Sequence, residues 1–411
     1  MIFQSYVNKM TDKNIKGALT GLKIIDLSRI LAGPYCTMIL ADMGAEVIKV
    51  EIPEVGDDSR AFPPFKNDES AYFKNMNRNK KGITLNLKEE QGKKVFMDLV
   101  RKADILVENY RPGTMEKLDL GYDKLKGINP GLVYGAVSGF GHYGQYSKRA
   151  GYDIIGQAMS GIMSVTGWPD GEPTRTGGPI SDTMAGLSLA LGILSAVIYK
   201  TKTGLGQKVD ISLVDTLVSS MQIINQIYLV GGRLPQRIGN RYESTYPYDT
   251  FETKEGENIV IGCANDKIWR ILCRLMGRED LADHPQMKEN RLRVENHEMI
   301  RPIVNEWTKT MPSQQIVDML LEKGVPVAPI YNIEQVSQDP HIAGDRDMFP
   351  EVEYPRVGKI RITNSHIKMS ETKPGFKFPS PDLGQHNTEI YKELLGYSED
   401  EIKELKRKGI I

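Results

Sequence analysis

Residues Gly21–Glu51 read GLKIIDLSRILAGPYCTMILADMGAEVIKVE, and this stretch decides the fold. Leu22–Leu27 and Glu46–Glu51 within it are short runs that predict two strands. Tyr35–Met43 predicts a helix between them, and Ile30–Pro34 predicts a tight glycine-containing turn before that helix. A strand–helix–strand unit of this length implies two parallel strands joined by a right-handed crossover.

The same alternation continues along the first half of the chain. Further strands are predicted at Ile83–Leu87, Asp104–Glu108, Leu132–Val137 and Lys208–Ser212, and helices at Glu89–Lys102, Asp182–Lys200 and Leu213–Val230. This order predicts an α/β fold with a Rossmann-like, doubly wound domain that has helices on both faces of a parallel sheet. Ligands of such sheets bind beyond the carboxyl ends of the strands, where Arg29–Pro34 and Asn109–Gly113 fall.

The pattern changes after Gly231, which indicates a second, smaller α/β domain. Its predicted elements are the strands Tyr248–Thr253 and Asn258–Gly262 and the helices Asn265–Met276, His297–Lys309 and Ser313–Lys323. We therefore expect a large domain formed by residues 1–225 and 335–411 and a small domain formed by residues 226–334. The tail is expected to resume strands after Asp339 and to end in a helix at Asp400–Lys408.

The composition excludes several classes of function. The 411 residues contain 53 Lys and Arg and 53 Asp and Glu, so no net charge attracts nucleic acid or an anionic membrane. The three cysteines have no CxxC spacing, and no two of the six histidines are two to five residues apart. This argues against a disulfide framework and a metal site, and it favours a reducing compartment. We expect a cytoplasmic protein.

Two segments bear on targeting and membranes. The first twenty residues have neither the apolar core of a signal peptide nor the arginines of a transit peptide. Thr183–Tyr199 is uncharged and just long enough to span a membrane, but it contains two glycines and two serines. We interpret it as a buried core helix.

The familiar catalytic motifs GxGxxG, GxxxxGK[ST], GxSxG and HExxH do not occur, which leaves acid/base or carboxylate chemistry. In the first turn, Gly33 would let the backbone approach a ligand, and Pro34 would begin a helix whose N–H groups face a phosphate. On this feature alone, an ordinary strand–helix turn is favoured over a ligand-binding turn. In the second loop, Tyr110 could stack on a ligand and Arg111 and Lys117 could bind phosphate. A solvated loop is an equal alternative.

The segment Gly161–Asp182 is so rich in Gly, Pro and Asp that it predicts a rigid loop beside a site. Asp170 lies in Trp168–Gly171, a turn sequence, which favours a role in the turn. Asp182 precedes the longest apolar helix, where aspartate is a favoured N-cap. A carboxylate nucleophile also fits this position, because the positive end of the helix keeps it ionised. Position alone favours the cap.

Taken together, these segments resemble the class III CoA-transferases, the CaiB/BaiF family, which includes formyl-CoA and carnitine CoA-transferases and 2-methylacyl-CoA racemases. The matching segments are Gly21–Glu51, Asn77–Leu87, Asp104–Gly113, Val137–Gly144, Gly151–Gly161, Asp182 with its helix, Thr203–Gln207 and Leu383–Ile410. The resemblance implies an enzyme that moves CoA from an acyl-CoA to a carboxylic acid. It also implies an interlocked homodimer whose subunits have a Rossmann-like large domain and a smaller one.

The resemblance assigns residues to the site. The family's nucleophile, an aspartate at the start of a helix, falls on Asp182, which reverses the preference for a cap. It would form an anhydride with the acyl group and then a thioester with CoA. Acyl-CoA is thus expected as a substrate, with no tightly bound cofactor and no metal. The family's CoA contacts fall on Leu31, Ala32, Leu85, Lys88, Asn109, Tyr110, Arg111, Lys117 and Tyr152.

The alternative within the family is a racemase. Racemases carry a His–Asp pair and a Glu where this chain has Tyr152–Asp153 and Asn265. Tyr152 and Asn265 cannot replace a poised imidazole and carboxylate near pH 7. Transfer is therefore favoured over racemisation. The glycine run of the formyl-CoA enzymes is missing after Gly239, which argues against oxalate or formate as the acid. Arg237 and Arg241 could bind an acceptor carboxylate or could simply be surface residues.

Overall fold

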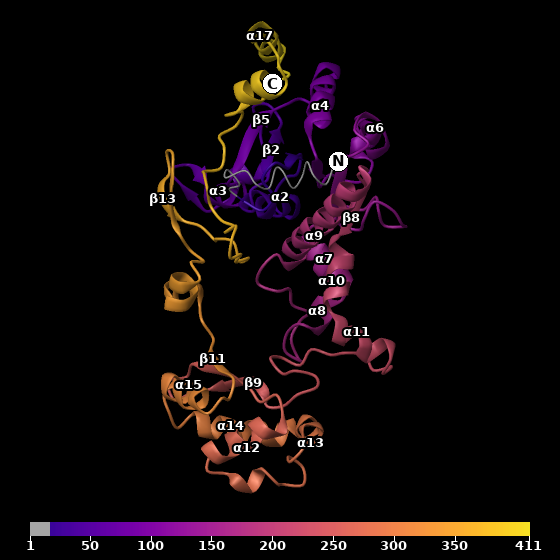
Figure 1. Cartoon of the computed structure of the whole chain (residues 1–411). Helices are drawn as coiled ribbons and strands as arrows, with labels where there is room; N and C mark the ends of the chain where they lie inside the picture. The colour runs from indigo at the N-terminus through magenta and orange to yellow at the C-terminus, as the bar shows by residue number, and fades with distance from the viewer. Residues whose placement is uncertain (1–16) are drawn as a thin grey trace. The chain divides into compact units, whose positions relative to one another are not determined.

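A computed structural model describes residues 17–411 of the chain, shown in Figure 1. Most of the segment tested for a signal peptide, residues 1–16, therefore lies outside the described residues. The chain divides into two compact units. The first comprises the described part of Met1–Ile162 together with Arg175–Leu229 and His341–Ile411, and the second comprises Met163–Thr174 and Val230–Pro340. Each unit is described by itself.

A six-stranded sheet is the centre of the first unit. Its strands are β1 (Lys23–Asp26), β2 (Glu46–Glu51), β5 (Lys80–Thr84), β6 (Ile105–Glu108), β7 (Val133–Ser138) and β8 (Lys208–Ser212). All neighbours pair in parallel, and the spatial order is β5-β2-β1-β6-β7-β8. The chain therefore winds outward in one direction from β1 and in the other from β6, as in a doubly wound Rossmann-type sheet. The predicted parallel sheet is confirmed.

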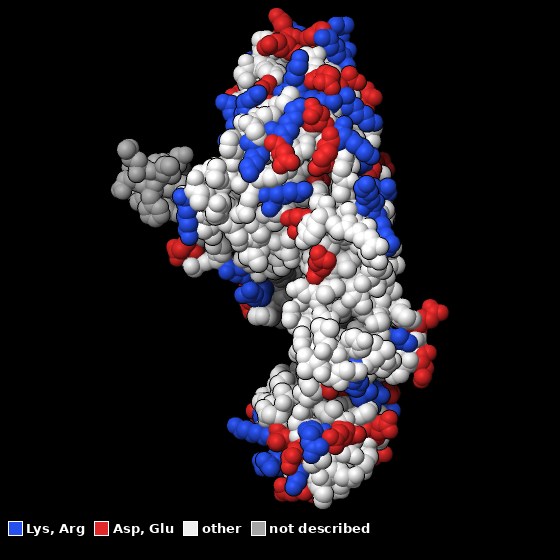
Figure 2. Space-filling view, turned by 90° about the vertical axis from the view of Figure 1, so that its right-hand side faces the viewer, with Lys and Arg blue, Asp and Glu red and all other residues white. Residues whose placement is uncertain are grey.

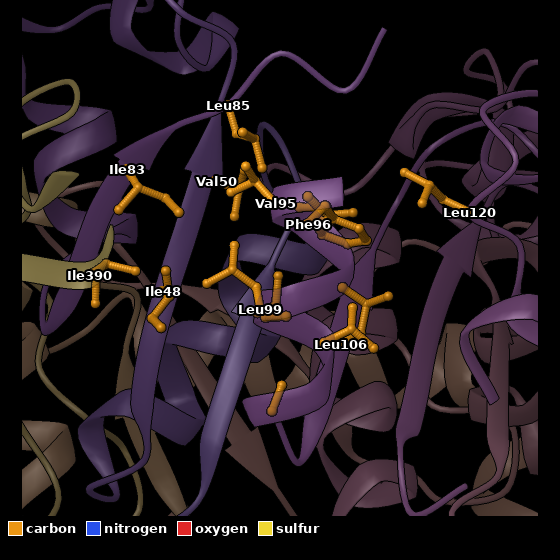
Figure 3. Packing of buried hydrophobic residues seen from close by; sticks show 14 of the residues in the cluster. Ile48, Val50, Ile83, Leu85, Val95, Phe96, Leu99, Leu106, Leu120 and Ile390 are labelled. Atoms are coloured by element: carbon orange, nitrogen blue, oxygen red, sulfur yellow. The ribbon is translucent and has the colours of Figure 1, made fainter. Parts of the chain in front are cut away.

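Side chains alternate between the two faces of this sheet and bury a separate core on each. Ile25, Ile48 and Leu106 pack with helix α4 (Glu90–Lys102) in the core drawn in Figure 3. Their neighbours Ile24 and Ile105 point to the other face and pack with α2 (Ala32–Asp42) and α9 (Ile180–Thr203). Most residues of β1, β2, β6 and β7 are therefore buried, so these strands appear in the sequence as short apolar runs.

The other helices in or next to the first unit are shorter. They are α3 (Ala71–Met76), α5 (Thr114–Lys117), α6 (Tyr122–Ile128), α7 (Asp153–Ser160), α8 (Ile162–Val165), α10 (Leu213–Ser220), α11 (Gln222–Leu229) and α17 (Glu399–Arg407) in or adjoining the first unit. Single-turn 3-10 and π segments lie at Asp58–Ala61, Glu279–Leu281, Pro340–Asp345 and Glu389–Leu394. Two-stranded sheets pair β3 (Phe65–Lys66) with β4 (Glu69–Ser70) and β12 (Glu351–Tyr354) with β13 (Gly358–Arg361).

Three predicted boundaries are wrong. The helix expected at Tyr35–Met43 begins at Ala32, so Gly33 and Pro34 form its first turn instead of preceding it. The strand expected at Ile83–Leu87 lies three residues earlier because Lys80 is a buried strand residue, which an apolar pattern does not reveal. The helix expected at Leu213–Val230 is interrupted at Met221, whose ψ of 42° leaves the helical region.

The second unit has an antiparallel sheet of order β11-β10-β9, formed by Val327–Pro329, Asn258–Gly262 and Tyr248–Glu252. Its helices are α12 (Asp266–Leu275), α13 (Asn290–Glu295), α14 (His297–Thr308), α15 (Ser313–Glu322) and α16 (Ile333–Gln338). Trp269 is fully buried at the centre of their core. The unit also includes Met163–Thr174, which the sequence did not predict. Two hydrogen bonds join this segment to the unit: Arg237 donates to the carbonyl oxygen of Gly171 (2.8 Å), and the Gly239 N–H donates to that of Gly167 (3.0 Å).

Among the described residues, α9 is the one helix that is long and apolar enough to cross a membrane. Its face formed by Ala185, Leu189 and Ile193 is buried in the core of the first unit, which confirms a core helix for that face. Leu191 and Ile198 on the other side remain exposed. The helix is therefore half-buried.

Helices α2 and α9 cross at a glycine. A Cβ atom on Gly186 would lie 2.5 Å from the carbonyl oxygen of Ala32, closer than side-chain carbons come to backbone. Gly186 therefore permits the two helix N-termini to approach each other. Because Asp182 lies one turn before Gly186, this approach places it beside the loop that precedes α2.

We predict that Gly186→Ala lowers the free energy of unfolding by about 1–3 kcal/mol, because the added methyl group must push α2 and α9 apart. Enzymatic activity should fall with it, since Asp182 moves with α9. Gly127→Ala is the matched control, because nothing lies within 4 Å of a Cβ on this helical glycine. That control should be neutral or stabilising by up to about 1 kcal/mol. Thermal or urea unfolding of both variants checks the prediction, and equal stabilities would contradict it.

Candidate active site

A buried ionic network holds the loop that follows β1. Asp26 accepts hydrogen bonds from the Ser28 main chain (2.9 Å), from the Thr37 hydroxyl (2.6 Å) and from the Lys80 ammonium (3.0 Å). Burial alone would raise the pKa of Asp26. The charges of Lys80 and Lys49 and the hydroxyl groups of Ser28 and Thr37 hold this pKa below its ordinary value. A carboxylate that stays charged in the core fixes its donors in place.

Lys49 extends this network toward the next loop. Its ammonium donates to the Ser28 carbonyl oxygen (3.0 Å) and to the Asp57 carboxylate (2.8 Å), and both side chains of this ion pair are fully buried. Asp57 in turn accepts from the main-chain N–H of Ile30 (3.2 Å). Ile30 has a φ of 69°, the left-handed conformation that a branched residue rarely adopts. The network thus holds a strained turn directly before α2.

The loops after β1 and β6 are locked together by Asn109. Its side-chain oxygen accepts from the Arg29 main-chain N–H (2.8 Å), and its amide nitrogen donates to the Arg29 carbonyl oxygen (2.7 Å). The two strands β1 and β6 flank the point where the sheet order reverses, which is where ligands of such sheets bind. Asn109 therefore has a structural role at this edge as well as its predicted contact with CoA.

A cavity of about 270 Å³ lies at this edge and contains Asp182. Besides Asp182, the predicted site residues that line it are Leu31, Ala32, Asn109, Tyr110, Arg111 and Tyr152. They come from the loop after β1, the loop after β6, and the start of α7. The cavity brings together segments that are 150 residues apart in the chain.

A second cavity, of about 380 Å³, adjoins the first. Its lining contains the remaining predicted residues, Leu85, Lys88 and Lys117, and it shares Arg29 and Tyr110 with the first cavity. The loop with Leu85 and Lys88 is held by the carboxyl end of the chain, since the Asn86 N–H donates to the carbonyl oxygen of residue 410 (2.8 Å). Because the two cavities share Arg29 and Tyr110, we infer that they form one candidate site.

Asp182 is not the N-cap of α9. The helix begins at Ile180, and Asp182 is its third residue. The capping role belongs to Asp153, whose carboxylate accepts from the main-chain N–H of Ser181 (2.8 Å) and of Asp182 (3.4 Å). The cap that the sequence favoured at Asp182 is therefore supplied by another aspartate, which leaves the Asp182 side chain free for chemistry.

The carboxylate of Asp182 is partly buried and, within residues 17–411, accepts no hydrogen bond. Burial, with the nearby charge of Asp153, raises its pKa to about 7. A carboxylate without donors is poorly stabilised as an anion, so it is more reactive toward an electrophile than a surface aspartate. This combination of cavity, burial and raised pKa is typical of a catalytic group.

Sequence reasoning missed three residues of the site. Arg29 lines both cavities, and its Nε atom is buried without a hydrogen-bond partner. Arg149 lines the cavity of Asp182. Arg29 begins the predicted segment Arg29–Pro34 but was given no role of its own, and Asp153 was named only at the position of the racemase pair. No pattern marks Arg149. Gly33 was expected to let a ligand approach the backbone. The structure gives another reason for a glycine here, because a Cβ on Gly33 would lie 2.2 Å from the Ser28 Cβ.

The other candidates lie in the second unit and have structural partners. Asp170 is exposed in a turn closed by the Gly171 N–H and the Trp168 carbonyl oxygen (3.0 Å). The guanidinium group of Arg237 donates hydrogen bonds to main-chain carbonyl oxygens of Trp168, Pro169 and Gly171. Arg241 lines a separate cavity of that unit, and Asn265 caps α12 by accepting from the Ile268 N–H (3.0 Å). The predicted rigid loop Gly161–Asp182 is thus shared between the two units.

Comparison with known proteins identifies the family. Residues 19–387 match the family described as CoA-transferase family III. The chain is 42% identical to a succinyl-CoA:mesaconate CoA-transferase of Haloarcula marismortui, over 92% of this chain and 96% of that one. It is 38% identical to a human succinyl-CoA:glutarate CoA-transferase, over 98% of this chain and 91% of that one.

A solved structure gives the same result. A CAIB/BAIF family protein from Brucella suis is 36% identical and superposes with a TM-score of 0.81, covering 92% of this chain and all of that one. The predicted membership and the predicted enzyme class are confirmed. The chain belongs to CoA-transferase family III and is a transferase that acts on CoA thioesters.

Proposed function

We propose that this enzyme transfers CoA from succinyl-CoA to a small dicarboxylic acid, with Asp182 as the covalent nucleophile. The observation that supports this most is the Asp182 carboxylate, which faces a cavity and has neither a hydrogen bond nor an ion pair within residues 17–411. Relatives at 36–42% identity carry names with succinyl-CoA as donor and mesaconate, glutarate or citramalate as acceptor. Donor and acceptor of this chemical type fit a site with several arginines.

The first half of the reaction loads CoA onto the enzyme. An oxygen of the Asp182 carboxylate attacks the thioester carbonyl carbon, the carbon–sulfur bond breaks, and CoA leaves as a thiolate. The thiolate then attacks the Asp182 carbonyl carbon of the resulting anhydride. This breaks the anhydride bond, releases the donor acid as a carboxylate and leaves Asp182 as a CoA thioester.

The second half reverses these steps with the acceptor. The acceptor carboxylate attacks the thioester of Asp182 and displaces CoA thiolate, which then attacks the acceptor's carbonyl carbon. The products are the new acyl-CoA and the regenerated Asp182 carboxylate, with no net proton transferred. Each anhydride requires donors for a transient oxyanion, a role that main-chain N–H groups at the start of α2 or α9 are suited to perform.

The two cavities suggest how the substrates lie. Lys88 and Lys117 of the second cavity provide positive charge for the phosphates of CoA, and the apolar Leu85 lines the same space. The pantetheine arm would then pass Tyr110 and Arg29 toward Asp182. Arg111 and Arg149 beside Asp182 would pair with the free carboxylate of a dicarboxylic acid. A monocarboxylic acid lacks that second charge and should be a poorer acceptor.

Racemisation remains the alternative activity, and the site supports it less. A racemase needs a proton donor and acceptor on both sides of an α-carbon. Tyr152 takes the position of the racemase imidazole, and Asn265 is engaged as a helix cap. Neither can exchange a proton near neutral pH.

We also propose that the active form is a homodimer. Helices α7, α9 and α11 carry many exposed apolar side chains; they include Ile154, Ile155, Met159, Leu187, Leu191, Ile198, Ile223, Tyr228 and Leu229. Figure 2 shows a broad area with few charged side chains on the side of the molecule that it draws. A second copy of the chain is the partner that would cover such a face.

The dimer has a direct test. Sedimentation at micromolar concentration should give about twice the 46.1 kDa of one chain. Leu191→Glu should shift this mass toward the monomer, because it places a charge on an exposed apolar position of α9. Lys403→Glu, on the distant helix α17, is the control and should leave the mass unchanged. A wild-type mass of one chain would contradict the proposal.

Substitution of Asp182 tests the nucleophile. Asp182→Asn should lower turnover of succinyl-CoA with glutarate or mesaconate by on the order of 10³ or more, while CoA binding persists.

Because the pKa of Asp182 is raised in the folded protein, its ionisation destabilises the fold as pH rises from about 4 to above 7. The variant should therefore be more stable than wild type at pH 8 and equally stable at pH 4.

Exposed Asp170→Asn serves as the control and should change neither turnover nor stability. Steady-state kinetics with di- and monocarboxylic acceptors and thermal unfolding at both pH values supply the measurements. Full turnover by Asp182→Asn would refute the nucleophile, and equal use of butyrate and glutarate would refute the dicarboxylate specificity.

A further inference from the structure

A chain of buried polar groups lies beneath the loop that joins β6 to α5. Glu108, the last residue of β6, is 1% exposed. One of its carboxylate oxygens accepts from the Tyr110 main-chain N–H (2.7 Å), and the other accepts from the Tyr134 hydroxyl (3.2 Å). Since Tyr110 lines both cavities, Glu108 fixes the conformation of a loop that the proposed CoA site requires.

His142 connects Glu108 to strand β8. Its Nδ1 atom lies 2.9 Å from the Lys208 ammonium, and its Nε2 atom lies 3.5 Å from the Glu108 carboxylate. The His142 main-chain N–H donates to Asp210 (2.8 Å), which holds the backbone at His142 against β8. An ammonium group can only donate, so Nδ1 accepts and the proton of the neutral ring is on Nε2, facing Glu108.

Glu108 is the member of this cluster that titrates near neutrality. Burial raises the pKa of Glu108 to about 7. The Tyr110 N–H, the Tyr134 hydroxyl and the charge of Lys208 act in the opposite direction, because they favour the anion. Burial and the charge of Lys208 lower the pKa of His142, so the ring is neutral at this pH. The other charged groups nearby are Asp210 of β8 and Glu116 of α5.

We propose that Lys208 and His142 are positioning residues for acyl-CoA, which act by holding Glu108 as an anion so that the Asn109–Arg111 loop keeps its binding conformation. This inference rests on the proposed function of the two cavities. Nothing in the reaction itself uses these groups. Their effect is on the shape of the loop: an anionic Glu108 holds the Tyr110 N–H about twice as strongly as a neutral acceptor does.

The inference predicts that CoA affinity depends on pH. Protonation of Glu108 below about pH 7 weakens its hold on Tyr110, so CoA binding should weaken from pH 8 to pH 6. Removing the charge of Lys208 raises the pKa of Glu108, so this transition should move to higher pH. A residue with a merely structural role would change stability without moving the transition.

The experiment measures the Kd of CoA by calorimetry between pH 5.5 and 8.5. Asp182→Asn is the parent protein, because Asp182 also has a pKa near 7 and would add its own transition. Lys208→Met in this parent should weaken CoA binding about tenfold at pH 7.5 and shift the transition upward. Lys208→Arg, which keeps the charge, should restore the parent's behaviour, and Glu108→Gln should abolish the transition.

Controls distinguish the effect of Lys208 on Glu108 from a general loss of structure. Tyr397→Phe removes a comparable hydrogen bond to a carboxylate, that of Asp98 (2.8 Å), without touching either cavity, and should leave the Kd unchanged. Thermal unfolding of every variant shows whether it is folded. A folded Lys208→Met protein with the parent's Kd and pH transition would overturn the inference alone. A parent that bound no CoA at any pH would overturn the proposed function and the inference with it.

Discussion

The ion pair between Asp26 and Lys80 is the interaction on which the site depends. Asp26 ends β1 and Lys80 begins β5, and both side chains are completely buried, with 3.0 Å between carboxylate and ammonium. Such a pair is costly to desolvate, and it is tolerated only when further hydrogen bonds satisfy it. Here Ser28 and Thr37 do so, and in doing so they bind the loop after β1 to the first turns of α2. A hydrophobic pair of similar volume would fill the space without holding that loop.

The rest of the site is assembled around this fixed loop. Asn109 joins the loop after β6 to it through the main chain of Arg29, and Gly186 lets α9 cross α2 closely enough for Asp182 to reach the same cavity. Asp153 caps α9 and adds the negative charge that, with burial, raises the pKa of Asp182. Within the described residues the Asp182 carboxylate accepts no hydrogen bond, and this is the feature that supports the proposal of a nucleophile at this position.

The sequence predicted the sheet well because its strands are buried on both faces and give short apolar runs between turns. It failed at Lys80, where a charged residue completes a strand, since a pattern cannot show that Asp26 will neutralise it. The resemblance assigned the nucleophile to Asp182, and this stays a prediction. The local position of Asp182 suggested a cap, which Asp153 provides from another helix. Arg149 and the membership of Met163–Thr174 in the second unit depend on tertiary contacts alone and left no pattern to read.

The central claim is that Asp182 forms a covalent bond with the substrate. The most direct test is to incubate the protein with succinyl-CoA, add hydroxylamine to trap the activated carboxyl group, and map the product by intact-mass and peptide mass spectrometry. The account predicts a hydroxamate at Asp182 that requires succinyl-CoA and is absent from Asp182→Asn. Transfer of CoA to glutarate with no modification at Asp182, or with the modification on another carboxylate, would contradict it.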